Sequence, residues 1–239
     1  MVKVSAIVSA YYAENFLKGR IENLLAQSLK PEIVIVCELG SPEDEIANDF
    51  ADVKIIHTDG IPTLYEAWNM AIKEAQGEYI TTANCDDRFY PRAIEKLAKA
   101  LDENKGFAMA YHDIDVVEEI DGKPIRTFNW YEGGLKELVY QGCFLGPMPM
   151  WRKSLHDKYG YFLEVETLKN GDQYKYEIVS DYEFWMRLAA GNEKFYHIKE
   201  VLGAYTSHGE NLEHKHPLRR MWEDARVKSK YSKRFEVIP

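Results

Sequence analysis

Short apolar runs alternate with helical patterns along the first third of the chain, and this alternation constrains the fold more than any other feature. Between the runs, apolar residues recur every three or four positions, which is typical of amphipathic helices. Strands that alternate with such helices form a parallel sheet with right-handed crossovers. The sequence therefore predicts an α/β fold with a mostly parallel central sheet flanked by helices. The runs are residues 2–9, 33–36, 53–57 and 78–82, with Pro62 opening the last helix and Gly77 closing it.

Three polar loops follow the predicted strands, at residues 9–12, 38–41 and 84–88. Parallel sheets bind ligands beyond the carboxyl ends of their strands, which share one edge, so we expect these loops to converge there. In the third loop, Asp86 and Asp87 bring oxygen atoms of the kind that a hard divalent cation prefers. Asp is also common in turns because it hydrogen-bonds its own backbone, so this loop alone is a weak signal.

The second half of the chain has a different pattern. Residues 107–119 and 124–130 flank an Asp-Gly turn and predict a β-hairpin. The segment 133–161 is rich in Gly, Pro and aromatic residues, which indicates loops. Ser180 and Glu183 match the capping-box pattern, in which a hydroxyl and a carboxylate satisfy backbone amides at the start of a helix. We therefore expect a hairpin and a loop-rich region before a late helix.

Composition and charge exclude several classes of protein. A chain of 239 residues that is 46% hydrophobic can bury one ordinary core. Its net charge of −9 makes nucleic acid an unlikely partner, because nucleic-acid surfaces need clustered cations. No apolar run approaches the roughly 20 residues that cross a bilayer. The stretch 215–234 is nevertheless rich in Lys and Arg, so it either contacts an anionic membrane surface or forms a solvated helix.

Cysteine usage and the start of the chain indicate a location. Cys37, Cys85 and Cys143 are dispersed and form no CxxC pair, which is typical of a reducing compartment. The residues after Met1 lead straight into a predicted strand, without the features of a signal peptide. We expect a cytoplasmic protein whose membrane contact, if it has one, is peripheral and at the inner face.

Five segments carry a more specific signal: residues 7–28, 33–41, 67–80, 84–87 and 180–188. In their order and spacing they resemble the inverting family-2 glycosyltransferases with the GT-A fold. The Asn-Cys-Asp-Asp turn stands where that family has a D-x-D-D metal motif. The last segment is similar to the family's “EDYDLWLRL” helix, and a His follows a late strand where the family has a metal-binding His. The resemblance implies the GT-A fold, a Rossmann-like fold of nucleotide-diphospho-sugar transferases.

The resemblance also implies a domain organisation and an activity. A single domain would cover residues 1–239, with a nucleotide-sugar-binding half at 1–105, an acceptor-binding half at 106–212 and a basic helix or tail at 213–239. The implied enzyme moves a sugar from a UDP-sugar, or else a GDP- or dTDP-sugar, to a hydroxyl of a glycan, a lipid-linked acceptor or another molecule. Mn²⁺ or Mg²⁺ would assist the transfer.

Individual roles follow from the same resemblance. Asp181 would be the general base that takes the proton of the acceptor hydroxyl, while Asp86 and His208 would hold the metal. Because Asp181 lies in the first turn of a helix, the helix dipole would keep it ionised but weaken it as a base, and burial would have to restore its basicity. The residues expected to contact the nucleotide are Ala10, Tyr11, Glu38, Asn69, Asn84 and Cys85.

Apolar side chains in the second half of the chain form a candidate acceptor site. Met and aromatic side chains suit the faces of sugars or an apolar aglycone. They equally suit the core beneath a site, and both interpretations stay open. The residues are Pro147, Met148, Trp151 and Trp185.

Two departures from the family pattern and two rival functions remain. Leu39 replaces the second Asp of the family's “DDGS” turn, which affects recognition of the base, and Asn84 replaces the first Asp of the metal motif. A sugar-phosphate nucleotidyltransferase would need a Gly-rich phosphate loop after the first strand, and residues 9–12 contain no glycine. A binding module that had lost catalysis would bind a nucleotide-sugar without turning it over.

Overall fold

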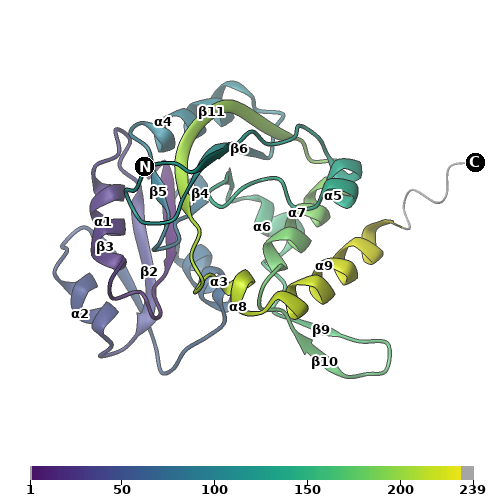
Figure 1. The fold of residues 1–239 in the computed structure, drawn as a ribbon, viewed down its shortest axis with the longest axis horizontal. Helices are drawn as coiled ribbons and strands as arrows, with labels where there is room; N and C mark the ends of the chain where they lie inside the picture. The colour runs from purple at the N-terminus through teal and green to yellow at the C-terminus, as the bar shows by residue number, and fades with distance from the viewer. Residues whose placement is uncertain (1, 233–239) are drawn as a thin grey trace, which may run out of the picture.

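The computed structural model describes residues 2–232, and one large sheet runs through both halves of the chain (Figure 1). Its strand order is β3-β2-β1-β4-β8-β6-β11-β5, with β7 beside β6. The first four strands pair in parallel, as expected for buried runs of Ile and Val connected by helices. They are β1 (Val4–Ser9), β2 (Glu32–Glu38), β3 (Val53–Thr58) and β4 (Tyr79–Thr82).

Short antiparallel strands complete this sheet. The strand β8 lies between β4 and β6 and is antiparallel to both, so it joins the parallel group β1–β4 to the parallel pair β6 and β11. β5 is antiparallel to β11, and β7 forms the predicted hairpin with β6. The predicted α/β fold with a mostly parallel sheet is therefore confirmed. The remaining strands are β5 (Arg88–Phe89), β6 (Met109–Val117), β7 (Arg126–Phe128), β8 (Met150–Arg152), β9 (Val165–Thr167), β10 (Gln173–Lys175) and β11 (Phe195–Thr206).

Helices cover both faces of the sheet, and the sheet separates the core into two apolar clusters. One cluster contains side chains of α1, α2 and α4, and the other contains side chains of α3, α5, α6, α7 and α9. The predictions omit α4, although its apolar residues recur at helical spacing. The helices are α1 (Leu17–Leu25), α2 (Pro42–Asn48), α3 (Leu64–Glu74), α4 (Ala93–Glu103), α5 (Leu135–Gln141), α6 (Leu155–Tyr159), α7 (Ser180–Ala190), α8 (Leu212–Lys215) and α9 (Pro217–Ser232).

The two ends of α3 differ from the prediction. Thr63 is its N-cap and forms a capping box with Glu66, so Pro62 precedes the cap instead of lying in the first turn. Ala75 is the C-cap. Gly77 lies two residues beyond this cap, where the chain passes close to β1. A Cβ at position 77 would lie 2.5 Å from the backbone nitrogen of Ser5, which explains the glycine.

A separate two-stranded hairpin, β9 and β10, packs against α9 at one side of the molecule (Figure 1). The ring of Tyr174 lies 4.4 Å from the ring of Trp222, and the guanidinium of Arg226 pairs with the carboxylate of Glu166 at 2.7 Å. α9 forms most of the predicted basic stretch, while residues 233–239 of the predicted tail lie outside the described residues.

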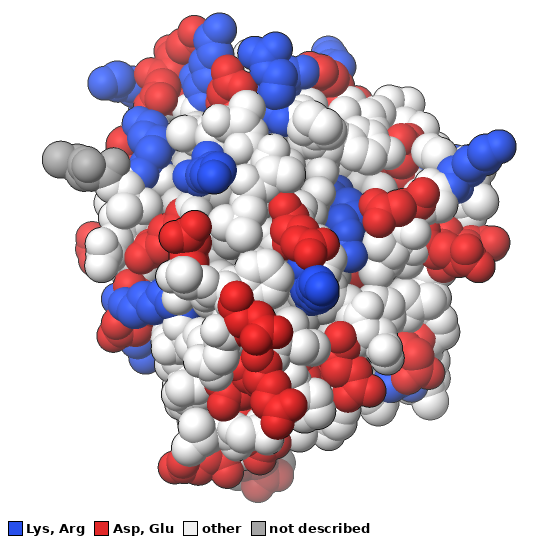
Figure 2. All heavy atoms as spheres, turned by 90° about the vertical axis from the view of Figure 1, so that its left-hand side faces the viewer, with Lys and Arg blue, Asp and Glu red and all other residues white. Residues whose placement is uncertain are grey.

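The side of the molecule shown in Figure 2 has no broad cationic face. Within residues 2–232, no helix is long and apolar enough to cross a bilayer. Acidic side chains gather on the face that carries α1 and α2, where Glu45, Asp49 and Asp52 are exposed (Figure 2).

Candidate active site

The three predicted loops converge at the carboxyl edge of the sheet. The backbone amide of Ala10 donates to the carbonyl oxygen of Val36 at 2.9 Å, which joins the first loop to the end of β2. The thiol of Cys85 lies 3.6 Å from the carbonyl oxygen of Ser9, which joins the first loop to the third. These contacts confirm that the parallel topology brings the loops together.

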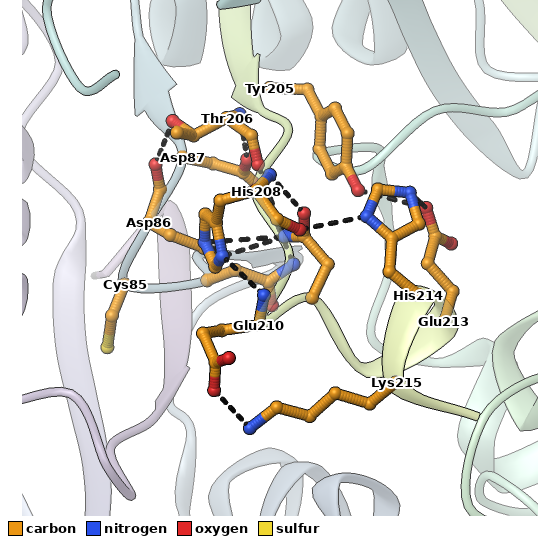
Figure 3. A network of polar contacts seen from close by, with 12 residues as sticks. Cys85, Asp86, Asp87, Tyr205, Thr206, His208, Glu210, Glu213, His214 and Lys215 are labelled. Atoms are coloured by element: carbon orange, nitrogen blue, oxygen red, sulfur yellow. Dashed lines mark hydrogen bonds and ion pairs between the residues drawn. The ribbon is translucent and has the colours of Figure 1, made fainter. Parts of the chain in front are cut away.

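Asp86 and His208 face each other at this edge, although they are 122 positions apart in the sequence (Figure 3). The Nε2 atom of His208 lies 3.0 Å from Oδ2 of Asp86, and both side chains are partly exposed. The amide of Asn211 donates to the same carboxylate oxygen at 3.2 Å. The pair that the resemblance implied for metal binding is thus brought together by the fold.

The pairing of β5 with β11 produces this arrangement. Asp86 lies just before β5, and β11 ends at Thr206, whose hydroxyl donates to the carbonyl oxygen of Asp86. The chain then turns, and Oδ1 of Asn211 accepts from the amide of His208 at 2.7 Å. The ring of Phe16 stacks on the imidazole with 6.0 Å between centroids. Backbone and side-chain contacts therefore fix both members of the pair.

Asn211 is a site residue that the sequence predictions missed. Its side chain is buried and contacts both Asp86 and His208, so it orients the pair. A sequence signal existed: an Asn three residues after the His and directly before α8 is a typical helix N-cap, and the backbone of Asn211 lies at that position.

The donor atoms of the pair suit a divalent cation. A carboxylate oxygen and an imidazole nitrogen face one another at a partly exposed position, beside a fixed amide. Glu210 donates its backbone amide to Nδ1 of His208 at 3.2 Å, so Nε2 carries the proton that is shared with Asp86. A cation held by both residues would replace this proton and would require the tautomer protonated on Nδ1.

Asp87 faces away from this pair and supports the loop. Its carboxylate accepts from the amide of Thr206 at 3.2 Å and from the side chain of Asn84 at 3.3 Å. Burial is the main reason why its pKa is raised to about 8, and the neighbouring charge of Asp86 adds to the effect. The buried guanidinium of Arg20 donates to the carbonyl oxygen of Asp87 at 3.0 Å. Asn84, expected at the nucleotide, thus contacts Asp87 in this structure.

A second group of metal-ligating atoms lies where β2 and β3 end. Among the described residues, the ligand atoms of Cys37, Asp44 and His57 lie within 4.8 Å of one another. Burial raises the pKa of the Cys37 thiol to about 11, so the thiolate that binds a metal is disfavoured. Asp44 instead accepts from Nε2 of His57 at 2.8 Å and from the amide of Gly40 at 2.9 Å. These contacts order the loop between β2 and α2.

Asp181 lies in the first turn of α7, with an environment that suits a proton acceptor. The hydroxyl of Tyr65 donates to its Oδ1 at 3.0 Å. Burial raises the pKa of Asp181 to about 6, against the lowering effect of hydrogen bonds from the Tyr182 amide and from Tyr65. The nearby carboxylate of Glu213 raises it further. Burial therefore does restore the basicity that the helix dipole removes.

The predicted capping box at the start of α7 is wrong. The N-cap is Val179, and no side chain of its own caps the helix. The hydroxyl of Ser180 instead donates to the carbonyl oxygen of Leu163 at 2.7 Å. Glu183 points into the interior, so it cannot reach back to the cap. Its carboxylate binds Arg187 of the same helix and two residues of α9. Those residues are Lys230 and Tyr231, at 2.7 and 2.8 Å.

The segment after β11 contacts the Asp86 pair (Figure 3) and also comes near Asp181. His214 contacts the carbonyl oxygen of His208 at 2.8 Å, and Tyr205 donates to Glu213 at 2.9 Å. Glu213 in turn is close enough to Asp181 to raise its pKa. The turn at 205–215 thus borders both parts of the candidate site.

The residues expected at the nucleotide are placed in different ways. Tyr11 is half-buried, and its hydroxyl lies 2.8 Å from that of Thr58. Glu38 is half-buried at the end of β2, whereas the side chains of Ala10 and Cys85 are buried, which leaves their backbone atoms as the groups nearest the loop surface.

Asn69 does not support the expected nucleotide contact. Its side chain is buried, and its amide donates to the carbonyl oxygen of Phe162 at 2.9 Å and to Glu164 at 2.7 Å. Its oxygen accepts from the Phe162 amide at 3.0 Å. The side chain therefore holds the segment before β9 against α3. An Asn in the sequence could equally face a ligand or a neighbouring backbone, and here the backbone needs it.

The candidate acceptor residues mostly fill the core. Met148, Trp151 and Trp185 are 1%, 0% and 1% exposed, and the two Trp rings pack edge to face at 5.3 Å. These three side chains leave no surface for an acceptor, so the structure favours the core interpretation and corrects the acceptor role. Pro147 is half-buried, and its carbonyl oxygen accepts from the hydroxyl of Thr82.

The fold and the Asp86 pair define a GT-A transferase. The sequence model of glycosyl transferase family 2 matches residues 5–160, and the chain belongs to this family. The protein is therefore a glycosyltransferase, and the resemblance of its motifs to that family is confirmed.

Relatives in two distant organisms agree with this assignment. The uncharacterized glycosyltransferase YwdF of Bacillus subtilis (strain 168) is 27% identical over 88% of this chain and 77% of its own length. The uncharacterized glycosyltransferase MJ1057 of Methanocaldococcus jannaschii is 24% identical over 84% of this chain and 70% of its own.

Solved structures share the fold. S. aureus TarS in complex with UDP superposes with a TM-score of 0.70 and 18% identity, over 96% of this chain and 65% of that one. The mannosyltransferase PcManGT of Pyrobaculum calidifontis, in complex with GDP-Man and Mn²⁺, superposes with a TM-score of 0.67 and 14% identity, over 98% of this chain and 64% of that one. This chain thus spans slightly less than two thirds of both solved chains.

Proposed function

We propose that the protein is an inverting glycosyltransferase that uses Asp181 as general base. The observation that carries the proposal is the environment of this carboxylate: burial raises its pKa to about 6, and Tyr65 fixes one of its oxygens. With such a pKa, the group is still ionised at pH 7 but accepts a proton more readily than an ordinary Asp.

In the proposed reaction, Asp181 takes the proton of the acceptor hydroxyl while the hydroxyl oxygen bonds to the anomeric carbon of the donor sugar. The bond from that carbon to the diphosphate oxygen breaks in the same step, and the nucleoside diphosphate leaves with the electron pair. The oxygen attacks opposite the leaving group, so the anomeric configuration inverts. Asp181 ends the step protonated and loses its proton to solvent.

Asp86 and His208 would hold a divalent cation, Mn²⁺ or Mg²⁺, while Asn211 orients both side chains. When bound, the cation neutralises the negative charge that grows on the diphosphate. The imidazole favours Mn²⁺, because Mg²⁺ prefers ligand sets made only of oxygen. The Mn²⁺ in the Pyrobaculum mannosyltransferase complex supports the same choice.

The proposed donor is a nucleotide-diphosphate sugar with uridine, or alternatively guanosine or deoxythymidine, as its nucleoside. S. aureus TarS has been solved with UDP and UDP-GlcNAc, and the Pyrobaculum enzyme with GDP-Man. Tyr11 and Glu38, on the first two loops, are half-buried and would meet the base and ribose. The acceptor would be a glycan, a lipid-linked molecule or another hydroxyl compound.

A donor screen tests the proposal. Purified protein is incubated with UDP-, GDP- and dTDP-sugars and Mn²⁺, and the release of nucleoside diphosphate is measured. We expect turnover of at least one donor and loss of turnover with EDTA. The rate of Asp181→Ala should be lower than that of the parent by a factor of about 10² or more. Asp49→Ala, which changes the exposed acid directly after α2, should keep the parental rate.

Three outcomes would contradict the proposal. Turnover that EDTA does not affect would remove the role of the cation, and an Asp181→Ala variant as fast as the parent would remove the general base. Donor binding without turnover of any donor would instead identify a non-catalytic nucleotide-sugar-binding module.

We also propose that the protein is cytoplasmic and touches the inner face of the membrane through α9. Leu218, Met221 and Trp222 are 80%, 66% and 44% exposed on this helix, beside the cation of Arg220. Apolar side chains next to cations suit an anionic bilayer surface. Lys233 and Arg234 of the predicted contact lie outside the described residues.

Vesicle flotation tests this contact. We expect the protein to float with vesicles that contain phosphatidylserine and to stay in solution with phosphatidylcholine alone, because the cations need an anionic surface. A Leu218→Ser, Met221→Ser double variant should lose the binding. Equal flotation of the parent and the double variant would contradict the proposal.

A further inference from the structure

Glu223, on α9, is a charged side chain with no exposed surface at all, since its relative exposure is 0%. A carboxylate removed from water is tolerated only where hydrogen bonds or ion pairs replace its hydration. Its Oε1 atom accepts from the hydroxyl of Tyr174 at 2.9 Å and lies 3.3 Å from Nε of Arg219. The remaining partners of this carboxylate all belong to one short backbone segment.

That segment is residues 177–179, which leads directly into α7. Oε1 of Glu223 accepts from the amide of Glu177 at 3.2 Å, and Oε2 accepts from the amides of Ile178 and Val179, both at 3.0 Å. Three consecutive amides thus point at one carboxylate. Hydrogen bonds to an ionised acceptor are among the strong ones, so this segment is firmly held.

Among the partners of Glu223 is the N-cap residue of α7, whose amide is the one that a Glu inside the helix accepts in a capping box. The N-cap residue Val179 offers no side-chain oxygen, and Ser180 uses its hydroxyl elsewhere. Glu223 supplies the negative charge at this helix start from another helix, where it also interacts favourably with the α7 dipole. The backbone that leads into the first turn of α7 is therefore held by a side chain of α9.

The first turn that is held in this way contains Asp181. The link is short: Val179 precedes Asp181 by two residues, and Ile178 is bonded on both sides. Its amide donates to Glu223, while its carbonyl oxygen and Oδ1 of Asp181 share the single hydroxyl proton of Tyr65. Glu223, the backbone at 178, Tyr65 and Asp181 form one connected set of hydrogen bonds.

We infer that Glu223 is a positioning residue for Asp181: it fixes the backbone that places the half-buried carboxylate. The inference rests on the proposed role of Asp181 as general base. Glu223 itself touches neither substrate nor reacting atoms. The titratable groups that face Asp181 from the neighbouring elements are Tyr65 of α3, Glu213 of α8 and Cys143 of the segment before β8.

The test compares Glu223→Gln and Glu223→Ala with the parent in the nucleotide-release assay. Gln keeps one oxygen for two of the amides, whereas Ala removes every acceptor. Small misplacements of a catalytic group can reduce rates by about 10²-fold, so we expect kcat to fall about 10-fold for Gln and about 100-fold for Ala. The KM for the donor should change by less than about twofold, since the donor loops are untouched.

The pH profile of kcat provides a readout that stability alone does not move. Burial is the main cause of the raised pKa of Asp181, so a loosened first turn that admits water should shift the acid limb below its parental midpoint. Hydrogen exchange at the amides of Ile178 and Val179 should also become at least about 10-fold faster. Glu223→Gln keeps these measurements accessible if the Ala variant does not fold.

Arg226→Gln is the matched control. Arg226 lies one turn further along α9 and forms a 2.7 Å ion pair with Glu166 of β9. The substitution removes this ion pair and leaves the contacts of residues 177–179 in place. We expect its kcat and acid limb to equal those of the parent. If it shifts both as Glu223→Gln does, general loosening of α9 explains the effect and the inference is overturned.

Failure of the inference can be separated from failure of the proposed function. If Asp181→Asn turns over like the parent, the general base is wrong and the positioning role falls with it. If Asp181→Asn is inactive while Glu223→Gln keeps the parental kcat, acid limb and amide exchange, only the inference is overturned.

Discussion

The ionised carboxylate of Asp181 lowers the free energy of unfolding, because burial raises its pKa from 3.8 to about 6. An unfolded chain ionises this group at lower pH than the folded protein does. The folded state therefore loses stability as pH rises from about 4 to about 6, and the whole cost remains at neutral pH. Two pKa units correspond to about 3 kcal/mol, an upper value for a group that keeps some contact with solvent.

Asp181→Asn should remove this cost while the hydroxyl of Tyr65 still donates to the amide oxygen. At pH 7.5 we expect urea unfolding to show a variant about 1–3 kcal/mol more stable than the parent, with the difference shrinking towards pH 4. The same substitution should abolish turnover. In the parent, kcat/KM should fall below a midpoint near pH 6. Equal stability of both proteins at all pH values would contradict the raised pKa.

Residue types predicted the chemistry of the site better than the direction in which side chains point. Asp86 and His208 were recognisable by motif and are brought together. Asn69 and Trp151 carried the same kind of signal yet turn inward, because a buried backbone needed the amide and the core needed the ring. Glu223 lacked any motif, since its partners are backbone amides that have no sequence signature.

At the scale of elements, predictability followed length and locality. The strands β1 to β4 are buried or half-buried, and β1, β2 and β3 pair with strands next to them in the chain, so short apolar runs identified them. β5 and β8 contain two and three residues, too few for any periodicity, and they pair with strands far away in the sequence. α7 begins at Ser180 as its own residues predicted, whereas the contact that holds its N-cap residue comes from α9 and has no local sequence signal.

The connection between α3 and β4 yields a prediction at this scale. Gly77→Ala would place a Cβ 2.5 Å from the Ser5 nitrogen and 2.8 Å from the Tyr79 carbonyl oxygen, both of them backbone atoms of central strands. Backbone in the middle of a sheet cannot move cheaply, so we expect a loss of about 1–3 kcal/mol in urea unfolding. Gly106→Ala, where a Cβ would meet nothing within 4 Å, should unfold within about 0.5 kcal/mol of the parent.

At the scale of the whole molecule, the parallel topology predicted where the active site lies but not how it is completed. The rule that ligands bind at the carboxyl edge placed residues 9–12, 38–41 and 84–88 together. Nothing in the local sequence showed that β11 would lie between β6 and β5 and bring His208 to Asp86. Pairing between strands so distant depends on the complete set of packing contacts, which no short window of sequence contains.

The order of strands also determines when the site can form during synthesis. Asp86 and His208 are separated by 122 residues, and within residues 2–232 β11 is the last strand to leave the ribosome. The first half of the sheet can begin to pair early, whereas contacts of large sequence separation form late because the intervening loop must close first. A nascent chain released before β11 has emerged therefore carries the three loops but lacks His208, so the Asp86 pair cannot form in it.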